Sequence, residues 1–262
     1  GGGGRGGAAP QAGVMSAVAG GSGDHGKRRV AAASDLHCRP EHGGRMRELV
    51  RAVNAEAELL VLCGDLTDRG HPEEAKVLAD ALSGLSVPCA AVLGNHDLDR
   101  GAGAEVTRLL GDAGVEVLDG DHLILRDDIG VAGVKGFMGG FGSATLQAFG
   151  EGPLKAFVQE AVTEALKLEA ALSQLDSDKR IVIMHYTPIP ETTVGENVEI
   201  RPFLGTSRLV APIDLYGADV VFHGHAHHGA LEGRTPRGTP VYNVAMPLLR
   251  KLTGRSFLVI EV

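Results

Sequence analysis

Short apolar runs alternate with helical patterns through the first half of the chain. Three brief, almost continuously apolar runs predict buried strands at 30–33, 59–63 and 87–93. Between and after them, apolar positions at helical spacing predict helices at 43–56, from Pro72 onward and at 104–113. Strands and helices in this order, recurring about every 30 residues, are typical of parallel βαβ units.

The second half has shorter runs and a less regular order. Further strands are predicted at 115–118, 122–125, 129–134, 181–184 and 220–222. Helices are predicted at 153–175 and 207–216, and the broad apolar face of the longer one includes Leu166. Beyond residue 228 the pattern predicts only strands and turns, with strands at 230–232, 241–244 and 257–262.

Other segments lack periodicity and define the limits of the fold. Residues 136–142 and 186–206 are rich in Gly or Pro and are predicted to be loops. A long irregular segment inside a compact domain is more often functional than idle, so we expect 186–206 to form a wall of the substrate site. No linker interrupts residues 29–262, which predicts a single domain, whereas the Gly-rich residues 1–28 are expected to be a flexible tail.

Composition narrows the classes of partner. The chain is 44% hydrophobic and 22% charged, as in an ordinary soluble globular protein. A formal charge of −8 and the absence of Trp argue against an extended nucleic-acid surface. No apolar run reaches the ~18–20 residues of a transmembrane helix, so no membrane partner is expected. The three cysteines give no disulfide framework, which favours the cytoplasm, and no pattern indicates an oligomeric state.

Polar residues that bind metals or transfer protons follow the predicted strands. They are Asp35, His37, Asp65, Asp68, Asn95, His96, His185, His225 and His227. Because the carboxyl ends of parallel strands meet at one edge of a sheet, we expect Asp35, Asp65 and Asn95 to lie along one edge. Carboxylate oxygen and imidazole nitrogen together suit Zn, Mn or Fe better than Ca or Mg.

Taken in order, these residues fall into five short motifs. The motifs are Asp35-Leu36-His37, Gly64-Asp65-x-x-Asp68, Gly94-Asn95-His96-Asp97, His185 and Gly224-His225-Ala226-His227. Together, over about residues 30–228, they resemble the signature of the calcineurin-like metallophosphoesterases. The resemblance implies an α/β fold, a four-layer αββα sandwich of two mixed β-sheets flanked by helices. It also implies a metal-dependent hydrolase of phosphate esters, with its site at the strand ends.

The same resemblance implies two divalent metal ions, manganese, iron or zinc. One would be held by Asp35, His37, Asp65 and His227. The other would be held by Asp65, Asn95, His185 and His225, so Asp65 would touch both. Two divalent ions with only two ionised ligands leave a cationic pocket, which favours a phosphate ester, and a hydroxide bridging the ions would attack phosphorus.

His96 is the predicted general acid. By resemblance it binds no metal but stands beside the scissile ester and protonates the departing oxygen. Asp68 would accept a hydrogen bond from the other ring nitrogen and so fix the tautomer. The alternative for Asp68 is a cap on the helix that begins near Pro72. Asp97 is expected to be a turn residue or a supporting acid.

The substrate is the least determined part. Substrate contacts are predicted for Arg69, Arg201 and Arg208, although Arg69 could equally form a surface salt bridge. Asp68 stands where purple acid phosphatases carry Tyr, and Asp97 where Ser/Thr protein phosphatases carry Glu. The single domain and the Gly-Asn-His-Asp motif look more like bacterial phosphodiesterases of the cyclic-nucleotide type. We therefore expect a small phosphodiester or nucleotide substrate; the alternatives are a phosphomonoesterase, including a protein phosphatase, and a non-catalytic metal-binding scaffold.

Overall fold

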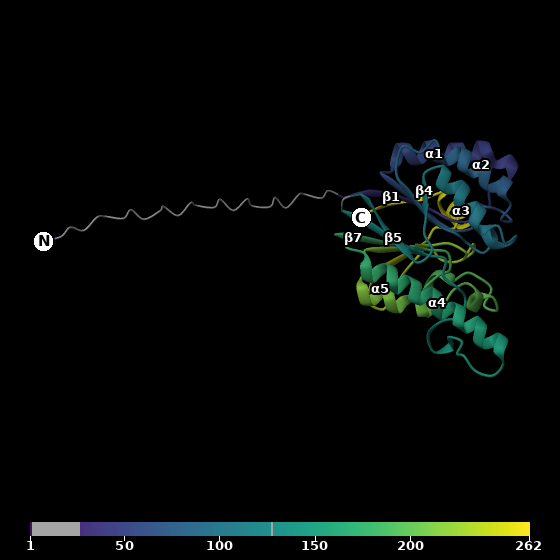
Figure 1. Cartoon of the computed structure of the whole chain (residues 1–262). Helices are drawn as coiled ribbons and strands as arrows, with labels where there is room; N and C mark the ends of the chain where they lie inside the picture. Colours follow the sequence, from purple (N-terminus) through teal and green to yellow (C-terminus); the bar gives the residue numbers. More distant parts are fainter. Residues whose placement is uncertain (2–26, 127) are drawn as a thin grey trace.

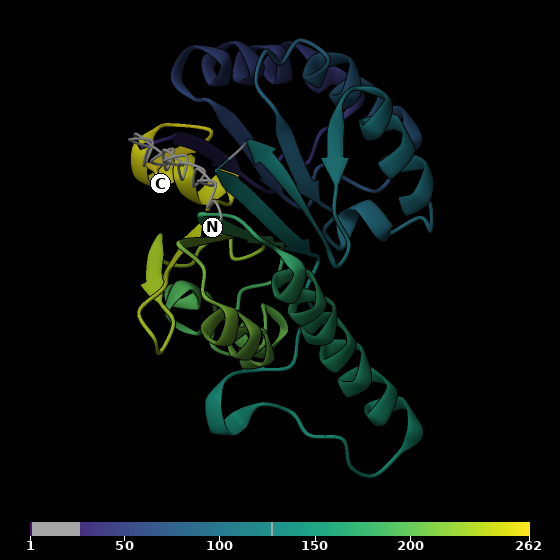
Figure 2. The ribbon, with the colours of Figure 1, turned by 60° about the vertical axis from the view of Figure 1, so that its left-hand side comes forward.

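Two β-sheets lie face to face, and helices cover the outer face of each (Figures 1 and 2). This computed structural model describes residue 1 and residues 27–126 and 128–262. The tail predicted over residues 1–28 thus lies, except for positions 1, 27 and 28, outside the described residues. The described part forms the four-layer αββα sandwich that the sequence predicts.

The first sheet has the strand order β11-β1-β2-β3-β4. Its strands are β1 (Arg29–Ala33), β2 (Leu59–Cys63), β3 (Cys89–Val92), β4 (Val115–Val117) and β11 (Leu258–Glu261). The strands from β1 to β4 run parallel, and β11 pairs antiparallel with β1. The predicted parallel βαβ units are therefore confirmed, with β3 shorter than the apolar run 87–93.

The second sheet has the order β5-β6-β7-β8-β10-β9. Its strands are β5 (Asp121–Arg126), β6 (Ile129–Val134), β7 (Lys179–Met184), β8 (Val220–His223), β9 (Glu232–Arg234) and β10 (Pro240–Asn243). The four central strands are parallel, and the edge strands β5 and β9 are antiparallel to their neighbours. Edge strand β9 lies slightly further along the chain than the expected 230–232.

The central strands are buried on both faces because helices cover the outer face of each sheet. On the first sheet lie α1 (Gly43–Glu56), α2 (Pro72–Leu82) and α3 (Gly103–Asp112); on the second lie α4 (Gly152–Gln174) and α5 (Val210–Tyr216) (Figure 1). In β2, Leu60 and Leu62 pack toward the helices, whereas Leu59 and Val61 pack toward the second sheet. Burial on two faces explains why such strands are continuously apolar and do not alternate.

The apolar face of α4 differs from the predicted one. Leu166 was expected on that face but is 57% exposed, whereas the nearby Glu164 is buried. Its carboxylate accepts a hydrogen bond from the Gly136 backbone N–H at 2.7 Å and lies 3.0 Å from Lys167 Nζ. The buried charge is thus satisfied by a loop that is distant in sequence, which helical periodicity does not reveal.

One helix was not predicted. The residues after β10 form α6 (Met246–Thr253), where the sequence pattern predicts only strands and turns. Met246 packs with the residues beneath the first helical layer, and Leu249 packs between the two sheets. Eight residues make only about two turns, too few for a helical period to stand out.

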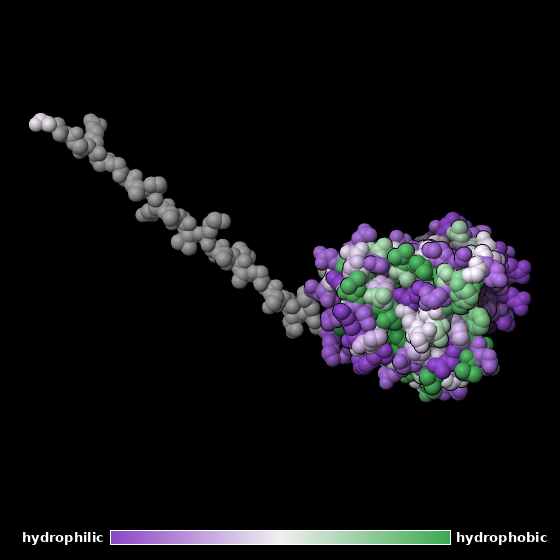
Figure 3. Space-filling view, turned by 90° about the horizontal axis from the view of Figure 1, so that it is seen from below, coloured by the Kyte–Doolittle hydropathy of each residue, from purple (hydrophilic) through white to green (hydrophobic). Residues whose placement is uncertain are grey.

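The face of the molecule formed by α4 and α5 is mixed in polarity. Viewed from below, the face of α4 and α5 shows hydrophobic residues interspersed among hydrophilic ones (Figure 3). Within the described residues, no helix combines the length and the apolar character needed to cross a membrane.

Candidate metal centre

Strained backbone marks the carboxyl ends of three strands. In the described part of the chain, the non-glycine residues with positive φ are Asp35 (54°), His37 (41°), Asp65 (50°) and His225 (69°). Left-handed backbone at such residues costs on the order of 1–3 kcal/mol each and persists only where the surroundings enforce it. All of these residues belong to the predicted ligand set, so the strain supports a functional site here.

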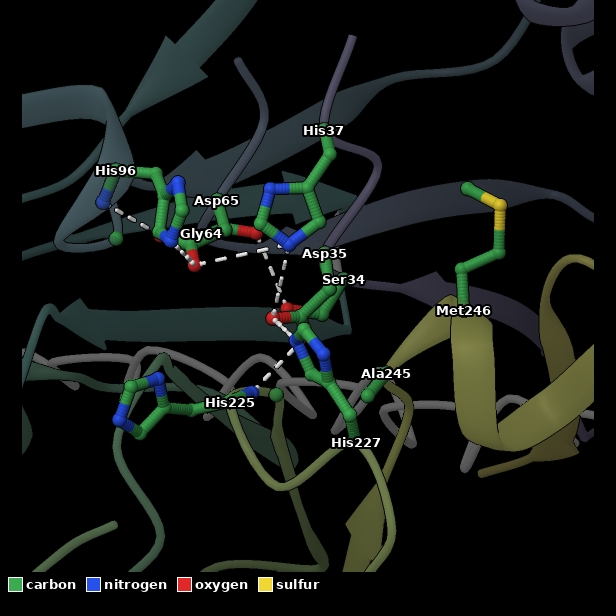
Figure 4. A network of polar contacts seen from close by, with 12 residues as sticks. Ser34, Asp35, His37, Gly64, Asp65, His96, His225, His227, Ala245 and Met246 are labelled. Carbon is green, nitrogen blue, oxygen red and sulfur yellow. Dashed lines mark hydrogen bonds and ion pairs between the residues drawn. The ribbon is translucent and has the colours of Figure 1, made fainter. Parts of the chain in front are cut away.

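Both sheets supply side chains to this site. Asp35 and His37 follow β1, Asp65 follows β2, His185 follows β7, and His225 follows β8. Backbone hydrogen bonds tie the strand ends together, from Asp35 N–H to Gly64 O and from His37 N–H to Asp65 O, both at 3.0 Å. In Figure 4 the side chains of Asp35, His37 and Asp65 point toward one another.

Asp65 lies at the centre. Its Oδ2 is 4.0 Å from His37 Nε2, and its Oδ1 is 3.4 Å from His185 Nε2. The two oxygens of one carboxylate therefore face two different groups of candidate ligands. This is the geometry expected of a shared ligand.

The first group contains Asp35, His37 and His227. Asp35 Oδ1 lies 2.9 Å from His227 Nε2 and 4.0 Å from His37 Nε2. Both ring nitrogens of His37 are buried and have no hydrogen-bond partner. Ring nitrogens buried without partners are costly unless something binds the free lone pair, and a cation would do so.

The second group contains Asp65, His185 and His225. In this group, as in the first, the candidate ligand atoms all lie within 4.8 Å of one another. The predicted ligand Asn95 is adjacent, with Oδ1 at 3.0 Å from His185 Nε2. The donor atoms are carboxylate oxygens and imidazole nitrogens, so these residues fit divalent transition metals.

Hydrogen bonds and nearby charges set the protonation of the candidate histidine ligands. His185 Nδ1 lies 2.9 Å from the Cys63 carbonyl, which only accepts, so Nδ1 carries a proton and Nε2 faces Asp65. Burial lowers the pKa of His185, but the charge of Asp65 outweighs it and raises the pKa to about 9. Burial and the charge of His185 lower the pKa of His225 to about 3, so this ring is neutral. Binding of a cation would displace the proton on Nε2 of His185, which faces Asn95 and Asp65.

The carboxylate of Asp35 is ionised although it is buried. Burial raises its pKa, but a hydrogen bond from His227 and the charges of His185 and His227 together hold the pKa below its ordinary value. A buried anion among imidazoles is a strong attractor for a divalent cation.

His96 and Asp68 are in contact, but not as expected. His96 Nδ1 lies 2.6 Å from the main-chain oxygen of Asp68, whereas the sequence interpretation gave this role to the carboxylate. The carboxylate is engaged elsewhere, with Oδ2 at 3.0 Å from Arg39 Nε and Oδ1 at 3.8 Å from His37 Nδ1. Nor does Asp68 cap α2, whose first turn is closed by His71 and Glu74. The tautomer of His96 is thus fixed by backbone.

His96 itself lies within reach of metal. Its Nε2 is 3.9 Å from Asp65 Oδ2, and His37, Asp65 and His96 form a third group of closely spaced ligand atoms. Its side chain is 40% exposed, more than those of the two aspartates. The predicted role as general acid is compatible with this open position. Whether a His96 variant keeps or loses metal distinguishes that role from a ligand role.

Asp97 supports the site from beneath. Its buried carboxylate accepts hydrogen bonds from Gly94 N–H at 2.8 Å, from Thr67 N–H at 2.8 Å and from the Thr67 hydroxyl at 2.6 Å. It therefore joins the loop after β2, which carries Asp65, to the loop after β3. The sequence interpretation of Asp97 as a supporting acid agrees with these contacts.

Asp97→Ala is expected to destabilise the metal-free protein by about 2–4 kcal/mol, because several buried N–H and O–H donors lose their acceptor. Urea denaturation measures the difference. Asp99→Ala removes an exposed carboxylate nearby and should leave the unfolding midpoint close to that of the wild type. Equal midpoints for the Asp97 and Asp99 variants would contradict the bracing role.

The three arginines predicted to contact substrate make their contacts with residues other than the candidate metal ligands. Arg69 is exposed beside Asp68. The Arg201 guanidinium donates to Thr193 Oγ1 and the Pro190 carbonyl, and the Arg208 guanidinium donates to the Leu146 carbonyl. The latter two side chains thus brace loops in this structure, and their contact with substrate stays a prediction.

The irregular segment 186–206 is anchored next to the site. Thr192 Oγ1 lies 2.9 Å from Nε2 of the buried His223, which precedes the Gly224–His227 motif. Thr192 Oγ1 also lies 2.7 Å from the hydroxyl of Thr187, two residues after His185. The segment therefore lies beside two of the ligand loops, as expected of a substrate wall.

Sequence reasoning missed Arg39 and the oxygen that holds His96. Arg39 lies two residues after His37 in the same loop, and this proximity could have drawn attention to it. The contact of His96 with a main-chain oxygen has no counterpart in residue identity, because every residue has a carbonyl.

Comparisons with known proteins bear on the family and the fold. The family model for calcineurin-like phosphoesterases matches residues 28–229. The phosphopantetheinyl hydrolase PptH of Mycobacterium tuberculosis is similar in structure, with a TM-score of 0.63 and 17% identity over 90% of this chain and 96% of that one. The protein TT1561 of Thermus thermophilus gives a TM-score of 0.56 and 17% identity over 90% and 99%. At these identities the likeness concerns the fold.

No curated protein sequence matches the chain. The family match nevertheless covers most of the described residues, beginning just before β1 and ending just beyond His227. The chain therefore belongs to the calcineurin-like phosphoesterase family.

Proposed function

We propose that this protein is a metal-dependent phosphoesterase that acts on a small phosphodiester or nucleotide. The observation that carries the proposal is the position of Asp65, whose two carboxylate oxygens face two groups of candidate ligands. A carboxylate placed in this way suits a pair of divalent cations, the arrangement that clamps both oxygens of an in-line displacement at phosphorus.

The candidate ligands divide into two sets around Asp65. Asp35, His37 and His227 would complete one set. Asn95, His185 and His225 would complete the other. When bound, manganese, iron or zinc would supply Lewis-acid chemistry, neutralising the phosphoryl oxygens and acidifying water.

His96 would provide the proton for the leaving oxygen. Its Nδ1–H donates to the Asp68 carbonyl, so Nε2 is the nitrogen that can exchange a proton at the open side of the site. The hydrogen bond to this main-chain oxygen both fixes the tautomer and orients the ring. General acid catalysis of this kind contributes typically ~10²–10⁴-fold.

The charge of the site supports a small anionic substrate. Asp35 and Asp65 are the only ionisable acids among the candidate ligands, so two divalent cations leave a net positive pocket in a protein of formal charge −8. The single domain and the Gly94–Asp97 motif favour a diester. A phosphomonoesterase is the second candidate, because the same pocket would also attract a dianionic ester.

Activity assays with restored metal test this proposal. Protein stripped of metal and reloaded with Mn, Fe or Zn is assayed with bis-p-nitrophenyl phosphate and with p-nitrophenyl phosphate. We expect hydrolysis of both only after metal addition, with the larger kcat/KM for the diester. A larger value for the monoester would favour the phosphomonoesterase, and no turnover with any of the metals would leave the non-catalytic scaffold.

A further inference from the structure

A pocket of about 290 Å³ opens beside the candidate metal centre. Its lining includes Asp35 and His37 of that centre and the neighbouring Asp68, together with three arginines, Arg39, Arg45 and Arg250. The arginines come from different elements: the loop after β1, helix α1 and helix α6. Such a concentration of positive charge next to Asp35 and His37 requires a physical account.

In the part of the chain that the structure describes, one of the three arginines pairs with an acid. Arg39 pairs with the Asp68 carboxylate at 3.0 Å. Among the described residues, neither Arg45 nor Arg250 forms an ion pair with an acid. Arg250 donates instead to the neutral Ser256 hydroxyl at 3.0 and 3.2 Å.

Arg45 is the less well satisfied of the two. One of its terminal nitrogens lies 2.8 Å from the sulfur of Met246, a weak acceptor. Its Nε is buried and has no hydrogen-bond partner. Arg45 and Arg250 line the same pocket. Partial burial and the positive charge of Arg250 lower the pKa of Arg45.

Two cations that repel each other, one with an orphaned donor, are stabilised by an anion between them. Arginine suits phosphate because its planar fork offers several parallel N–H donors. The ordinary interpretation of a surface arginine is a solvated charge, which fits the exposed Arg47 and Lys251 and, taken alone, the exposed Arg250. That interpretation does not account for the buried Nε of Arg45.

The pocket is held in a fixed position relative to the metal centre. The Met246 N–H at the start of α6 donates to the Ser34 carbonyl at 2.9 Å, and Ser34 directly precedes Asp35. Figure 4 shows Ala245 and Met246 of this segment beside Ser34 and Asp35. The helix that carries Arg250 is therefore tied to the strand end that carries a candidate ligand.

We propose that Arg45 and Arg250 bind a second phosphate group of the substrate while the scissile ester lies at the metal centre. The inference rests on the proposed function and narrows it. The substrate is then a small phosphodiester with an additional phosphate nearby, as in a terminally phosphorylated dinucleotide. Because Asp35 and His37 line the pocket and also belong to the metal centre, the two phosphates would lie side by side.

A pair of dinucleotides tests the proposal on the Mn-loaded protein. ApA and its 5′-phosphorylated form pApA contain the same scissile diester and differ by one phosphate. The wild type should favour pApA in kcat/KM by about tenfold or more, the gain expected for hydrogen bonds to a charged group. In Arg45→Gln/Arg250→Gln the ratio should fall to about one.

A matched variant controls for net charge. Arg47→Gln/Lys251→Gln removes the same charge from exposed positions on the same helices and should keep the preference for pApA. A wild type that hydrolyses ApA as well as pApA would overturn the proposal, as would a preference that survives in the Arg45/Arg250 variant. If bis-p-nitrophenyl phosphate is hydrolysed but neither dinucleotide is, the inferred substrate class fails while the proposed function stands.

A binding measurement tests the pocket without activity. Inorganic phosphate is titrated into the metal-free proteins and followed by ³¹P NMR, with urea midpoints confirming that the variants are folded. Wild type and the Arg47/Lys251 control should bind phosphate saturably, and the Arg45/Arg250 variant about tenfold or more weakly. Equal affinity in all three would refute the pocket, even if the protein proves to hydrolyse no ester at all.

Discussion

Asparagine in place of Asp65 is expected to leave the protein unable to retain metal. The substitution keeps the shape of the side chain but removes the one charge that faces both ligand groups. Metal affinity should fall by more than the ~10–100-fold that supporting residues of metal sites cost. Metal analysis after loading with Mn and gel filtration measures the loss, and phosphoesterase activity should disappear with the metal.

The same variant has a second readout without metal. The charge of Asp65 is what raises the pKa of His185 to about 9 against the effect of burial, so this pKa should fall in Asp65→Asn. NMR titration of the histidines follows it. Asp68→Asn is the matched control, because the Asp68 carboxylate belongs to none of the candidate metal groups in the described residues. An Asp65→Asn protein with wild-type metal content would contradict the shared-ligand assignment.

His96→Asn should show the opposite pattern, with metal retained and turnover lost. Removal of a general acid lowers kcat by typically ~10²–10⁴-fold, since the leaving oxygen must depart without a proton. The loss should be greatest for substrates with poor leaving groups, because good ones need little protonation. A series of aryl phosphate esters of increasing leaving-group pKa measures this dependence in the wild type and the variant.

The metal content of the His96 variant also distinguishes two roles for His96, general acid and metal ligand. The candidate ligand atoms of His37, Asp65 and His96 all lie within 4.8 Å of one another, so His96 could act as a metal ligand. If His96→Asn lost metal, the ligand role would replace the acid role. The Asp68 carboxylate does not hold the His96 ring, so Asp68→Asn should leave the Nδ1 hydrogen bond in place.

The fold was predictable where burial leaves a local pattern. Central strands such as β2 and β7 are buried on both faces, so each is an apolar run that ends in a polar ligand. Parallel pairing aligns the strand ends within each sheet, and the face-to-face packing of the two sheets sets the end of β2 beside the end of β7. Pairing alone does not join Asp65 to His185, so the motif resemblance was needed to place them in one site.

Other features depend on contacts that no local pattern records. Glu164 is buried because the Gly136 N–H lies opposite it, and Leu166 is exposed because the register of α4 turns it outward. Helix α6 is too short for its period to be recognised. Arg45 has the sequence pattern of an ordinary helix-surface residue, and only the approach of α6 makes it part of a pocket.

Metal-dependent hydrolysis of bis-p-nitrophenyl phosphate, measured together with metal content, tests the central claim most directly. Metal-free protein should be inactive, and addition of Mn should restore hydrolysis in proportion to bound metal, saturating at about two ions per chain. Hydrolysis that persists without metal, or a fully loaded protein that hydrolyses no phosphate ester, would contradict the account.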